Sequence, residues 1–487
     1  MDKNVDAKNK KNDIVPKGGK IIQFQLRESL LTQMLENSSH ISTLHNIIMS
    51  FVAIFVIATI GDYIRQPSKF SDEFEMFLWN ANDIGRFIQI CIIMHLSVIC
   101  LHYPLVLFNN FLQYRWLLNN SEKNLNNLFD MYQKRQYSGQ IPQAFLYTAY
   151  TMISFFGIFL YGTNSVIVHD IKLSGSFAVL METVRLLMKS HSFFIEKKDL
   201  HIEKEEIAKL IAQRQSNIVK SFWSLPSRAR LRNLAYYLFA PTLIYSDYYP
   251  RTDKIRWSRV LKFGIQFIVA AMIGFLIFCR FVVANFSKTG IEPFPLNFNF
   301  LYKVFASGAA IYLIGFYGFL HTWHNFTAEL MRFGDRHYYE DFWNVTSLKD
   351  YYRKWNRIVQ LWLYVYIFLP INYRFHNRNL ANNFVVLISA IMHEYILAVT
   401  IRFFFPVNFI FFAVVGQLIY FLENHDKNSS KQPSIKSILF HTNMFIGWGL
   451  LILFYSLEWH SKINCPLPEQ STMLEKMTPR FIKCIKF

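Results

Sequence analysis

Residues 383–401 read NFVVLISAIMHEYILAVTI, an apolar run whose only ionisable side chains are His393, Glu394 and Tyr395. A helix rises about 1.5 Å per residue, so this run covers most of the ~30 Å hydrocarbon core of a bilayer. Apolar runs of similar length recur along the chain, at 47–64, 86–108, 144–168, 258–285, 300–322, 382–401, 403–422 and 438–457. The sequence therefore predicts an all-α, polytopic membrane protein.

The composition agrees with a membrane protein. Of 487 residues, 52% are hydrophobic and only 17% are charged, whereas soluble chains average about 25% charged residues. This excludes a soluble enzyme and a disordered scaffold. The net charge of +18 does not require a nucleic-acid partner, because cytoplasmic loops of membrane proteins carry an excess of Lys and Arg. Five Cys in a chain of this length make no disulfide framework.

Residues 176–194 (SFAVLMETVRLLMKSHSFF) carry four ionisable side chains among apolar ones at helical spacing. This pattern suits an amphipathic helix on the membrane surface. It also suits a span whose polar face looks into the protein, and we count it as the ninth span. The shorter apolar stretches 233–247 and 359–370 are expected to form interfacial or re-entrant helices.

Nine spans place the two termini on opposite sides of the membrane. We expect a disordered cytosolic tail over residues 1–45, a transmembrane domain over 46–458 and a luminal tail over 459–487. The polar, basic block 195–231 then returns to the cytosol after four spans, in agreement with the positive-inside rule.

His393 is the first candidate for chemistry. Ionisable groups at membrane depth cost a few kcal/mol and mark functional sites. A neutral imidazole shielded from water suits a general base that acts on a lipid hydroxyl. Ser389 lies one turn earlier on the same helix face, whereas Glu394 points about 100° away and is expected to orient the helix. The alternative is a histidine that only fixes helix packing through a hydrogen bond.

The second candidate is the segment 331–357 (MRFGDRHYYEDFWNVTSLKDYYRKWNR), in which aromatic and basic residues alternate. It suits an aromatic belt with flanking Lys and Arg at the membrane interface. It also suits a cytosolic-side site for an anionic ligand with an apolar tail, where guanidinium groups hold phosphates and aromatic faces stack a base. Composition leaves both readings open.

The motifs YYEDFWN (338–344) and YYRKWN (351–356), followed by a histidine within an apolar span, resemble the membrane-bound O-acyltransferases. Within them the chain is similar to the sterol O-acyltransferase branch. Further matches lie at METVRLLMKSHSF (181–193), YYLFAPTLIYSDYYPRTDKIRW (236–257), FYSLEW (454–459) and the tail pair Cys465 and Cys484. The resemblance runs from about residue 140 to the C-terminus.

The resemblance implies transfer of a long-chain acyl group from acyl-CoA to the 3-hydroxyl of a sterol, giving a steryl ester and CoA. It implies that His393 is the catalytic base and that Asn356 assists it. It also implies a set of acyl-CoA contacts: Arg353, Ser389, Arg378, Tyr351, Trp355, Asp341 and Trp343. No metal and no cofactor are implied, since acyl-CoA is a substrate.

The chain departs from the family pattern at four positions. Arg378 stands where relatives have Lys, Tyr338 replaces Phe, Phe342 replaces Trp, and Gln360 replaces His. The first change retains charge and the next two retain aromatic bulk, so we expect altered affinity rather than lost activity.

The resemblance further implies about nine helices around a buried tunnel, a luminal disulfide between Cys465 and Cys484, and the endoplasmic reticulum membrane. Besides membrane lipids, it implies a homodimer or a dimer of dimers. A diacylglycerol O-acyltransferase is the nearest alternative, and a lipid transporter or non-catalytic scaffold is a more distant one.

Overall fold

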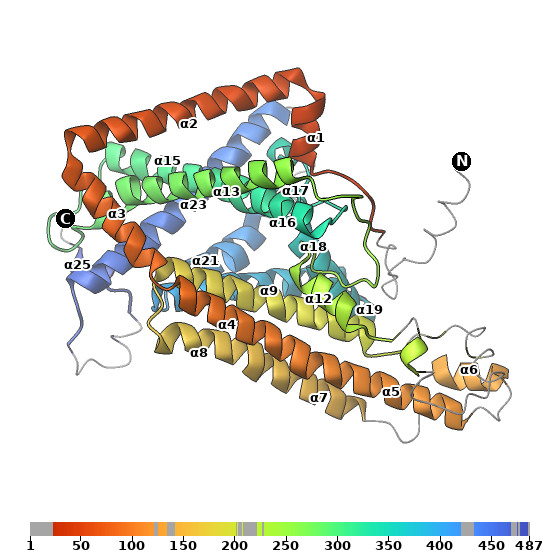
Figure 1. Ribbon diagram of the computed structural model, residues 1–487. Helices are drawn as coiled ribbons and strands as arrows, with labels where there is room; N and C mark the ends of the chain where they lie inside the picture. Colours follow the sequence, from red (N-terminus) through yellow and green to blue (C-terminus); the bar gives the residue numbers. More distant parts are fainter. Residues whose placement is uncertain are drawn as a thin grey trace. The chain divides into compact units, whose positions relative to one another are not determined.

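The computed structural model describes most of the chain. The described residues are 23–120, 125–133, 142–200, 202, 207, 222–225, 228–419, 433–468, 475 and 478–485. Nearly all regular structure in these ranges is helical, and the extended pairing found there is limited to isolated bridges (Figure 1). The predicted all-α fold is confirmed.

Seven helical runs in the described part of the chain are long and apolar enough to cross a membrane. They are Ser39–Arg65, Pro67–Asn119, Gln143–Val168, Trp257–Phe286, Phe298–Met331, Arg378–Ile401 and Ile435–Asn464. Each contains one of the apolar runs found in the sequence. The polytopic architecture is confirmed, whereas the count of nine spans is not.

The other two expected spans fall short for different reasons. The run 403–422 forms a helix described over Val407–Ile419, about 20 Å long and shorter than the hydrocarbon core, and residues 420–422 lie outside the described ranges. The segment 176–194 lies within α9 (Leu173–Lys197), which is long enough but too polar to count as a span.

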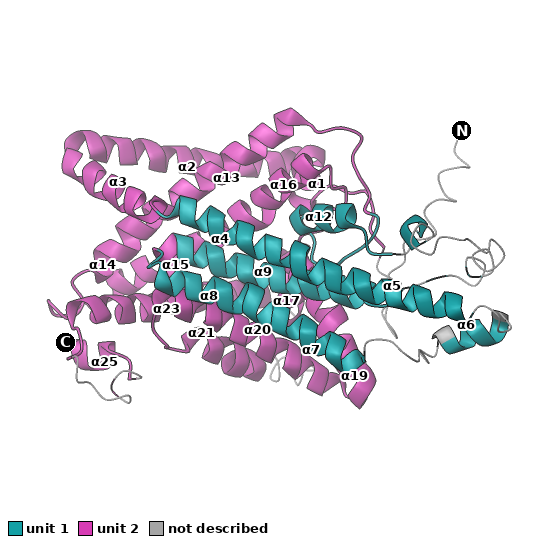
Figure 2. Ribbon diagram, turned by 60° about the horizontal axis from the view of Figure 1, so that its bottom comes forward, with its two compact units in different colours: residues 1–12, 83–171, 175–248 teal, residues 13–82, 172–174, 249–487 magenta. Residues whose placement is uncertain are grey.

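The chain divides into two compact units (Figure 2). Unit 1 comprises residues 1–12, 83–171 and 175–248, and its described part is helical. Its elements, with α9 entering at residue 175, are α4 (Ile84–Ser97), η2 (Val98–His102), α5 (Tyr103–Asn119), α6 (Leu125–Gln133), α7 (Gln143–Ser154), η3 (Phe155–Leu160), α8 (Tyr161–Val168), α9 and α12 (Leu231–Phe239).

The polar face of α9 is turned into unit 1. Lys189 is 1% exposed and its ammonium donates to the carbonyls of Tyr237, Leu238 and Ala240 at the C-terminal end of α12. A cation at a helix C-terminus is favourable, and three acceptors satisfy its three donors. This burial favours the second reading of α9, a helix whose polar groups are paired inside the protein.

Unit 2 comprises residues 13–82, 172–174 and 249–487. Its described helices before residue 345 are α1 (Leu30–Asn37), α2 (Ser39–Arg65), α3 (Pro67–Ala81), α13 (Trp257–Ile277), η4 (Phe278–Val283), α14 (Ala284–Phe286), α15 (Phe298–Gly315), η5 (Phe316–Trp323), α16 (His324–Met331) and η6 (Phe342–Asn344). Those that follow are α17 (Leu348–Lys354), α18 (Arg357–Leu363), η7 (Tyr364–Phe368), α19 (Leu369–Phe375), α20 (Arg378–Ile401), α21 (Val407–Ile410), η8 (Phe411–Val415), α23 (Pro433–Asn464) and α25 (Phe481–Cys484).

The short stretch 359–370 forms helix, as part of a continuous run from α18 through η7 to α19. The stretch 233–247 is helical only over 233–239, within the nine-residue α12, and its remaining residues are not helical. Neither run is among the seven candidate spans.

The described part of the expected disordered tail is ordered. Residues 1–22 lie outside the described ranges, but α1 and the start of α2 fill 30–45. Ser29 is fully buried, and Arg27 forms an ion pair with Asp335 at 2.5 Å. Within the described part of this segment, Arg27 and Glu28 therefore pair with residues 308 positions away, Asp335 and Arg336.

The C-terminal segment contains the disulfide that the resemblance implied. The sulfurs of Cys465 and Cys484 are bonded, and the Arg480 guanidinium donates to the carbonyl of Cys465 within the same loop. The bond closes a loop of 19 residues after α23.

The helices α15 and α23 meet backbone to backbone at two glycines. A Cβ placed on Gly308 would lie 2.7 Å from the backbone nitrogen of Gly449. Small residues at helix crossings allow this close approach within membranes. The small-residue cluster around Gly308 therefore packs closely against α23.

Replacing Gly308 by Ala is expected to destabilise the protein by about 1–3 kcal/mol, because the added methyl forces α15 and α23 apart. Gly315→Ala is the matched control in the same helix, since no atom lies within 4 Å of a Cβ there, and it should be neutral or slightly stabilising. Thermal unfolding of the detergent-purified variants measures the difference. Equal melting temperatures would contradict the packing described.

Candidate functional site

The helix α20 positions His393 and fixes which ring nitrogen carries the proton. The Asn377 side chain caps its N-terminus by accepting from the Leu380 backbone N–H at 3.0 Å. One turn before His393, the carbonyl of Ser389 lies 2.7 Å from Nδ1 of the imidazole. A carbonyl only accepts, so Nδ1 of a neutral ring holds the hydrogen and Nε2 carries the lone pair. Such a ring has the tautomer of a general base.

The His393 ring lies against Phe412 of η8. Their centroids are 4.9 Å apart and nearly parallel, and Phe412 in turn lies 5.4 Å from the ring of Tyr352 in α17. From Tyr352 the ring contacts continue to Tyr351 and then to Trp355. A continuous row of aromatic rings therefore joins the histidine of α20 to the segment 351–356.

The Glu394 side chain has a structural role, as a buried hydrogen-bond acceptor. It is 5% exposed and accepts hydrogen bonds from the Phe409 backbone N–H and from the hydroxyl of Tyr455 in α23, both at 3.0 Å. The Tyr455 hydroxyl also accepts from the backbone N–H of Asn408. Glu394 therefore fastens α20 to α21 and α23, and points away from the His393 ring as the helical geometry predicted.

Asn356 stands between α17 and α18 as the N-cap of the latter. Its Oδ1 accepts from the Val359 backbone N–H at 3.1 Å, so its Nδ2 hydrogens face away from the helix as donors. The described contacts include no direct bond between Asn356 and His393. The two are connected by the aromatic row, since Asn356 follows Trp355 directly.

Four of the expected contact residues gather in one aromatic cluster or beside it. Trp355 stacks on Tyr312 at 4.7 Å and meets the edge of Phe342 at the same distance. Trp343 lies 5.1 Å from Phe342, and Tyr351 is 5% exposed within the cluster.

The fourth expected residue, Asp341, adjoins Phe342 and forms an ion pair with Lys354 at 2.8 Å. This hydrogen bond holds the pKa of Asp341 below its usual value.

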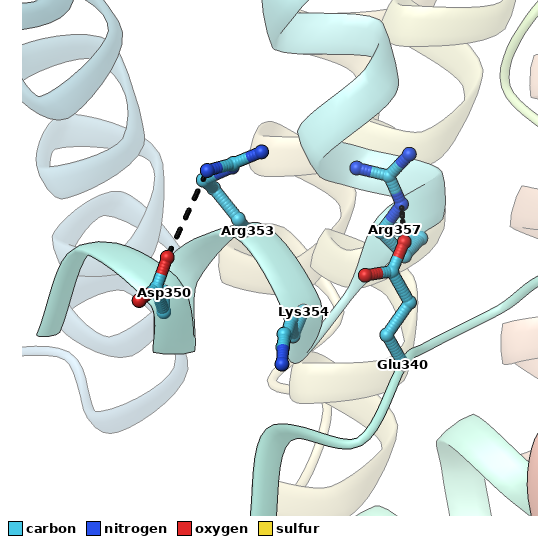
Figure 3. A pocket seen from close by; sticks show the side chains of 5 residues that line it. All are labelled: Glu340, Asp350, Arg353, Lys354 and Arg357. Carbon is cyan, nitrogen blue, oxygen red and sulfur yellow. Dashed lines mark ion pairs between the residues drawn. The ribbon is translucent and has the colours of Figure 1, made fainter. Parts of the chain in front are cut away.

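A charged cavity of about 150 Å³ opens beside the cluster (Figure 3). Its walls carry three cations and two carboxylates: Glu340, Asp350, Arg353, Lys354 and Arg357. The Arg353 guanidinium is 63% exposed and lies 3.7 Å from Asp350, while Arg357 pairs with Glu340 at 3.0 Å. The cavity has the exposed, fork-shaped donors that suit a phosphate or carboxylate ligand.

The remaining expected contacts lie along α20. Ser389 is half-buried one turn from His393, with its hydroxyl 3.5 Å from Nδ1. Arg378 is exposed at the first residue of the helix, 15 residues before His393, which corresponds to roughly 22 Å of helix. An elongated ligand is required to reach both.

The sequence reasoning missed the acidic partners of the cations. Glu340 and Asp350 line the charged cavity, and the spacing of Asp350 and Arg353 is the three-residue spacing of neighbours on a helix. That spacing is the feature of the sequence that could have predicted the ion pair between Asp350 and Arg353. Phe412 was also missed, and its contact with His393 carries no signal in the sequence.

Comparison with known proteins finds one family model and several relatives that match most of the chain. The family model described as MBOAT, membrane-bound O-acyltransferase family, matches residues 77–457. Mouse sterol O-acyltransferase 1 is 32% identical over 474 residues, covering 96% of this chain and 80% of its own length. Rat sterol O-acyltransferase 2 is 30% identical over 493 residues, covering 98% of this chain and 83% of its own length.

Glu394→Ala is expected to lower the free energy of unfolding by about 2–3 kcal/mol, because it leaves the Phe409 N–H and the Tyr455 hydroxyl without their acceptor. Tyr455→Phe should cost about 1 kcal/mol, and the double variant less than the sum, since the two residues share one bond. Thermal unfolding of the three variants tests this, and strict additivity would argue against the shared network.

Proposed function

The chain belongs to the membrane-bound O-acyltransferase family and is an acyltransferase, and on that premise we propose that it esterifies sterols. The donor is a long-chain acyl-CoA, the acceptor is the sterol 3-hydroxyl, and the products are a steryl ester and free CoA. The observation that carries the proposal is the His393 imidazole, whose Nδ1 donates to Ser389 and whose Nε2 is therefore the basic nitrogen.

His393 acts as general base. Nε2 takes the proton of the sterol hydroxyl as its oxygen attacks the thioester carbonyl carbon. The tetrahedral intermediate collapses by breaking the carbon–sulfur bond, and the imidazolium returns its proton to the leaving CoA thiolate. A thioester is already an activated acyl donor, so this chemistry proceeds without a covalent acyl-enzyme.

Asn356 stabilises the oxyanion. Its Oδ1 is engaged by the cap of α18, which directs the Nδ2 hydrogens outward as donors. One such donor contributes about 3 kcal/mol to transition-state stabilisation in other acyl-transfer enzymes. Because Trp355 and the aromatic row fix the preceding backbone, the amide is held in place before the substrate arrives.

The charged cavity receives the anionic part of CoA. Arg353 is exposed and only loosely paired, and Lys354 and Arg357 add positive charge beside it. Phosphate oxygens replace part of the carboxylate pairing in this arrangement. The adjoining aromatic residues Tyr351, Trp355 and Trp343 line the path of the pantetheine and acyl chain toward His393, through the tunnel that we propose among the helices.

The sterol acceptor is proposed from the relatives, whose names state sterol O-acylation. We also propose the endoplasmic reticulum membrane, a cytosolic N-terminus, a luminal C-terminus and a homodimer or dimer of dimers, as the sequence analysis expected. The bonded Cys465 and Cys484 agree with a luminal tail, because disulfides persist in that compartment.

His393→Ala is expected to reduce steryl ester formation by at least about a thousandfold while leaving acyl-CoA binding intact, since only the base is removed. His441→Ala is a matched control, because His441 lies in α23 with the same bond from Nδ1 to the carbonyl four residues earlier. Ester formation is measured with labelled acyl-CoA in membranes. An active His393→Ala variant would contradict the assignment.

The acceptor is tested by incubating these membranes with labelled acyl-CoA and either cholesterol or diacylglycerol. The proposal predicts labelled steryl ester in the first incubation and little triacylglycerol in the second. Triacylglycerol as the main product would show a diacylglycerol O-acyltransferase with the same histidine base. Lipid flux that continues in the His393→Ala variant without any ester product would indicate a transporter.

A further inference from the structure

Residues 25–28, which we call the N-terminal segment, run beside the segment 333–336 and pair with it through an isolated bridge between Arg27 and Asp335. The Arg27 backbone N–H donates to the Gly334 carbonyl at 2.9 Å, and the Arg336 N–H donates to the Arg27 carbonyl at 3.1 Å. On the opposite side, Gly334 N–H donates to the Pro250 carbonyl at 2.9 Å. The segment 333–336 is therefore held between the N-terminal segment and residues 250–252.

Gly334 shows how closely these three segments approach. A Cβ at this position would lie 2.6 Å from Leu26 and 3.0 Å from the carbonyl oxygen of Pro250. The Arg27 guanidinium adds two bonds to the Asp335 carboxylate, from Nε at 2.5 Å and from Nη2 at 3.3 Å. The N-terminal segment is therefore in close contact with the segment 333–336.

Glu28 joins three guanidinium groups. Its carboxylate lies 2.8 Å from Arg256, 2.9 Å from Arg259 and 2.9 Å from Arg336. Arg336 is 1% exposed and its second carboxylate partner is Glu329, which is fully buried. A buried guanidinium that loses one of its two carboxylates is left undercompensated, which destabilises the position of the loop that carries it.

The loop leads directly into the proposed acyl-CoA site. Four residues after Arg336, Glu340 lines the charged cavity. The Glu340 backbone N–H donates to the Lys354 carbonyl, and the Tyr338 carbonyl accepts from the Arg357 N–H, both at 2.9 Å. These two bonds bracket Trp355 and Asn356, so a displacement at Arg336 is transmitted to the cavity wall and to Asn356.

We propose that Glu28 is a positioning residue for the acyl-CoA site. Through Arg336 it holds the loop 333–340 so that the walls of the charged cavity, Glu340 and Arg357, and the adjacent Asn356 take their working positions. This inference rests on the proposed function for the identity of the ligand. It assigns to the N-terminal segment a role in the binding of the acyl-CoA donor and none in the binding of the sterol acceptor.

The test compares Glu28→Gln with Glu36→Gln. Glu36 is half-exposed and pairs with Arg259, so its loss leaves Arg336 and the loop unchanged. We expect Glu28→Gln to raise the dissociation constant of a non-reactive acyl-CoA thioether, and the acyl-CoA KM, about tenfold. The KM for sterol should stay within about twofold of wild type, and Glu36→Gln should match wild type throughout.

A second pair of variants protects the test against simple misfolding. Arg27→Asp and Asp335→Arg should each weaken thioether binding, and the double variant should restore it, because the ion pair is re-formed with its ends exchanged. Unchanged binding in Glu28→Gln would overturn the proposal. Equal increases in the KM for acyl-CoA and the KM for sterol in Glu28→Gln would also overturn it, since they indicate general instability. A double variant of Arg27 and Asp335 that does not regain thioether binding would indicate the same.

The binding readout separates this inference from the proposed function. If wild type binds the thioether but forms no ester with sterol, the acceptor assignment fails while the role of Glu28 is still measured by binding. If ester forms normally and Glu28→Gln binds the thioether as wild type does, the role of Glu28 fails alone.

Discussion

The structure depends on one constraint: a polar side chain that is removed from water must find its partners inside the protein. Lys189 satisfies it with three carbonyls, and Glu394 with a backbone N–H and the Tyr455 hydroxyl. His393 engages Nδ1 with Ser389 and thereby assigns the lone pair to Nε2. The first two side chains are used for packing, and only the third presents a basic atom suited to chemistry.

The site is built across segments that are far apart in the sequence. The row of rings from His393 through Phe412 and Tyr352 to Trp355 joins a membrane helix to a short polar segment. Large aromatic side chains are rigid and bury extensive surface, so they hold two elements in register without charged contacts. The hydrogen-bonding Asn356 and the cations of the charged cavity are placed by the same row and its neighbours.

Local patterns were enough to predict the apolar helices and to select His393 as a candidate, whereas Asn356 and the acyl-CoA contacts were expected only from the family resemblance. Length and hydropathy identified the seven runs that the structure supports as spans, and helical periodicity separated Glu394 from His393. Partnerships over long sequence distances were not predictable. Glu28 and Arg336 are 308 residues apart, and nothing in their local sequence shows that they pair, so a polar N-terminal segment was read as disordered. Hydropathy also does not report where a helix begins: in the run 403–422, residues 403–406 lie outside the helix that is described over Val407–Ile419.

The proposed mechanism is tested most directly by a structure of the protein in lipid with bound acyl-CoA thioether and sterol. It predicts the sterol hydroxyl within hydrogen-bond reach of Nε2 of His393, about 3 Å, with the acyl-CoA carbonyl position facing Asn356. The CoA phosphates should lie against Arg353 or Arg357. The mechanism would be contradicted if the His393 ring touched only lipid and the acyl-CoA thioether were bound away from His393 and Asn356.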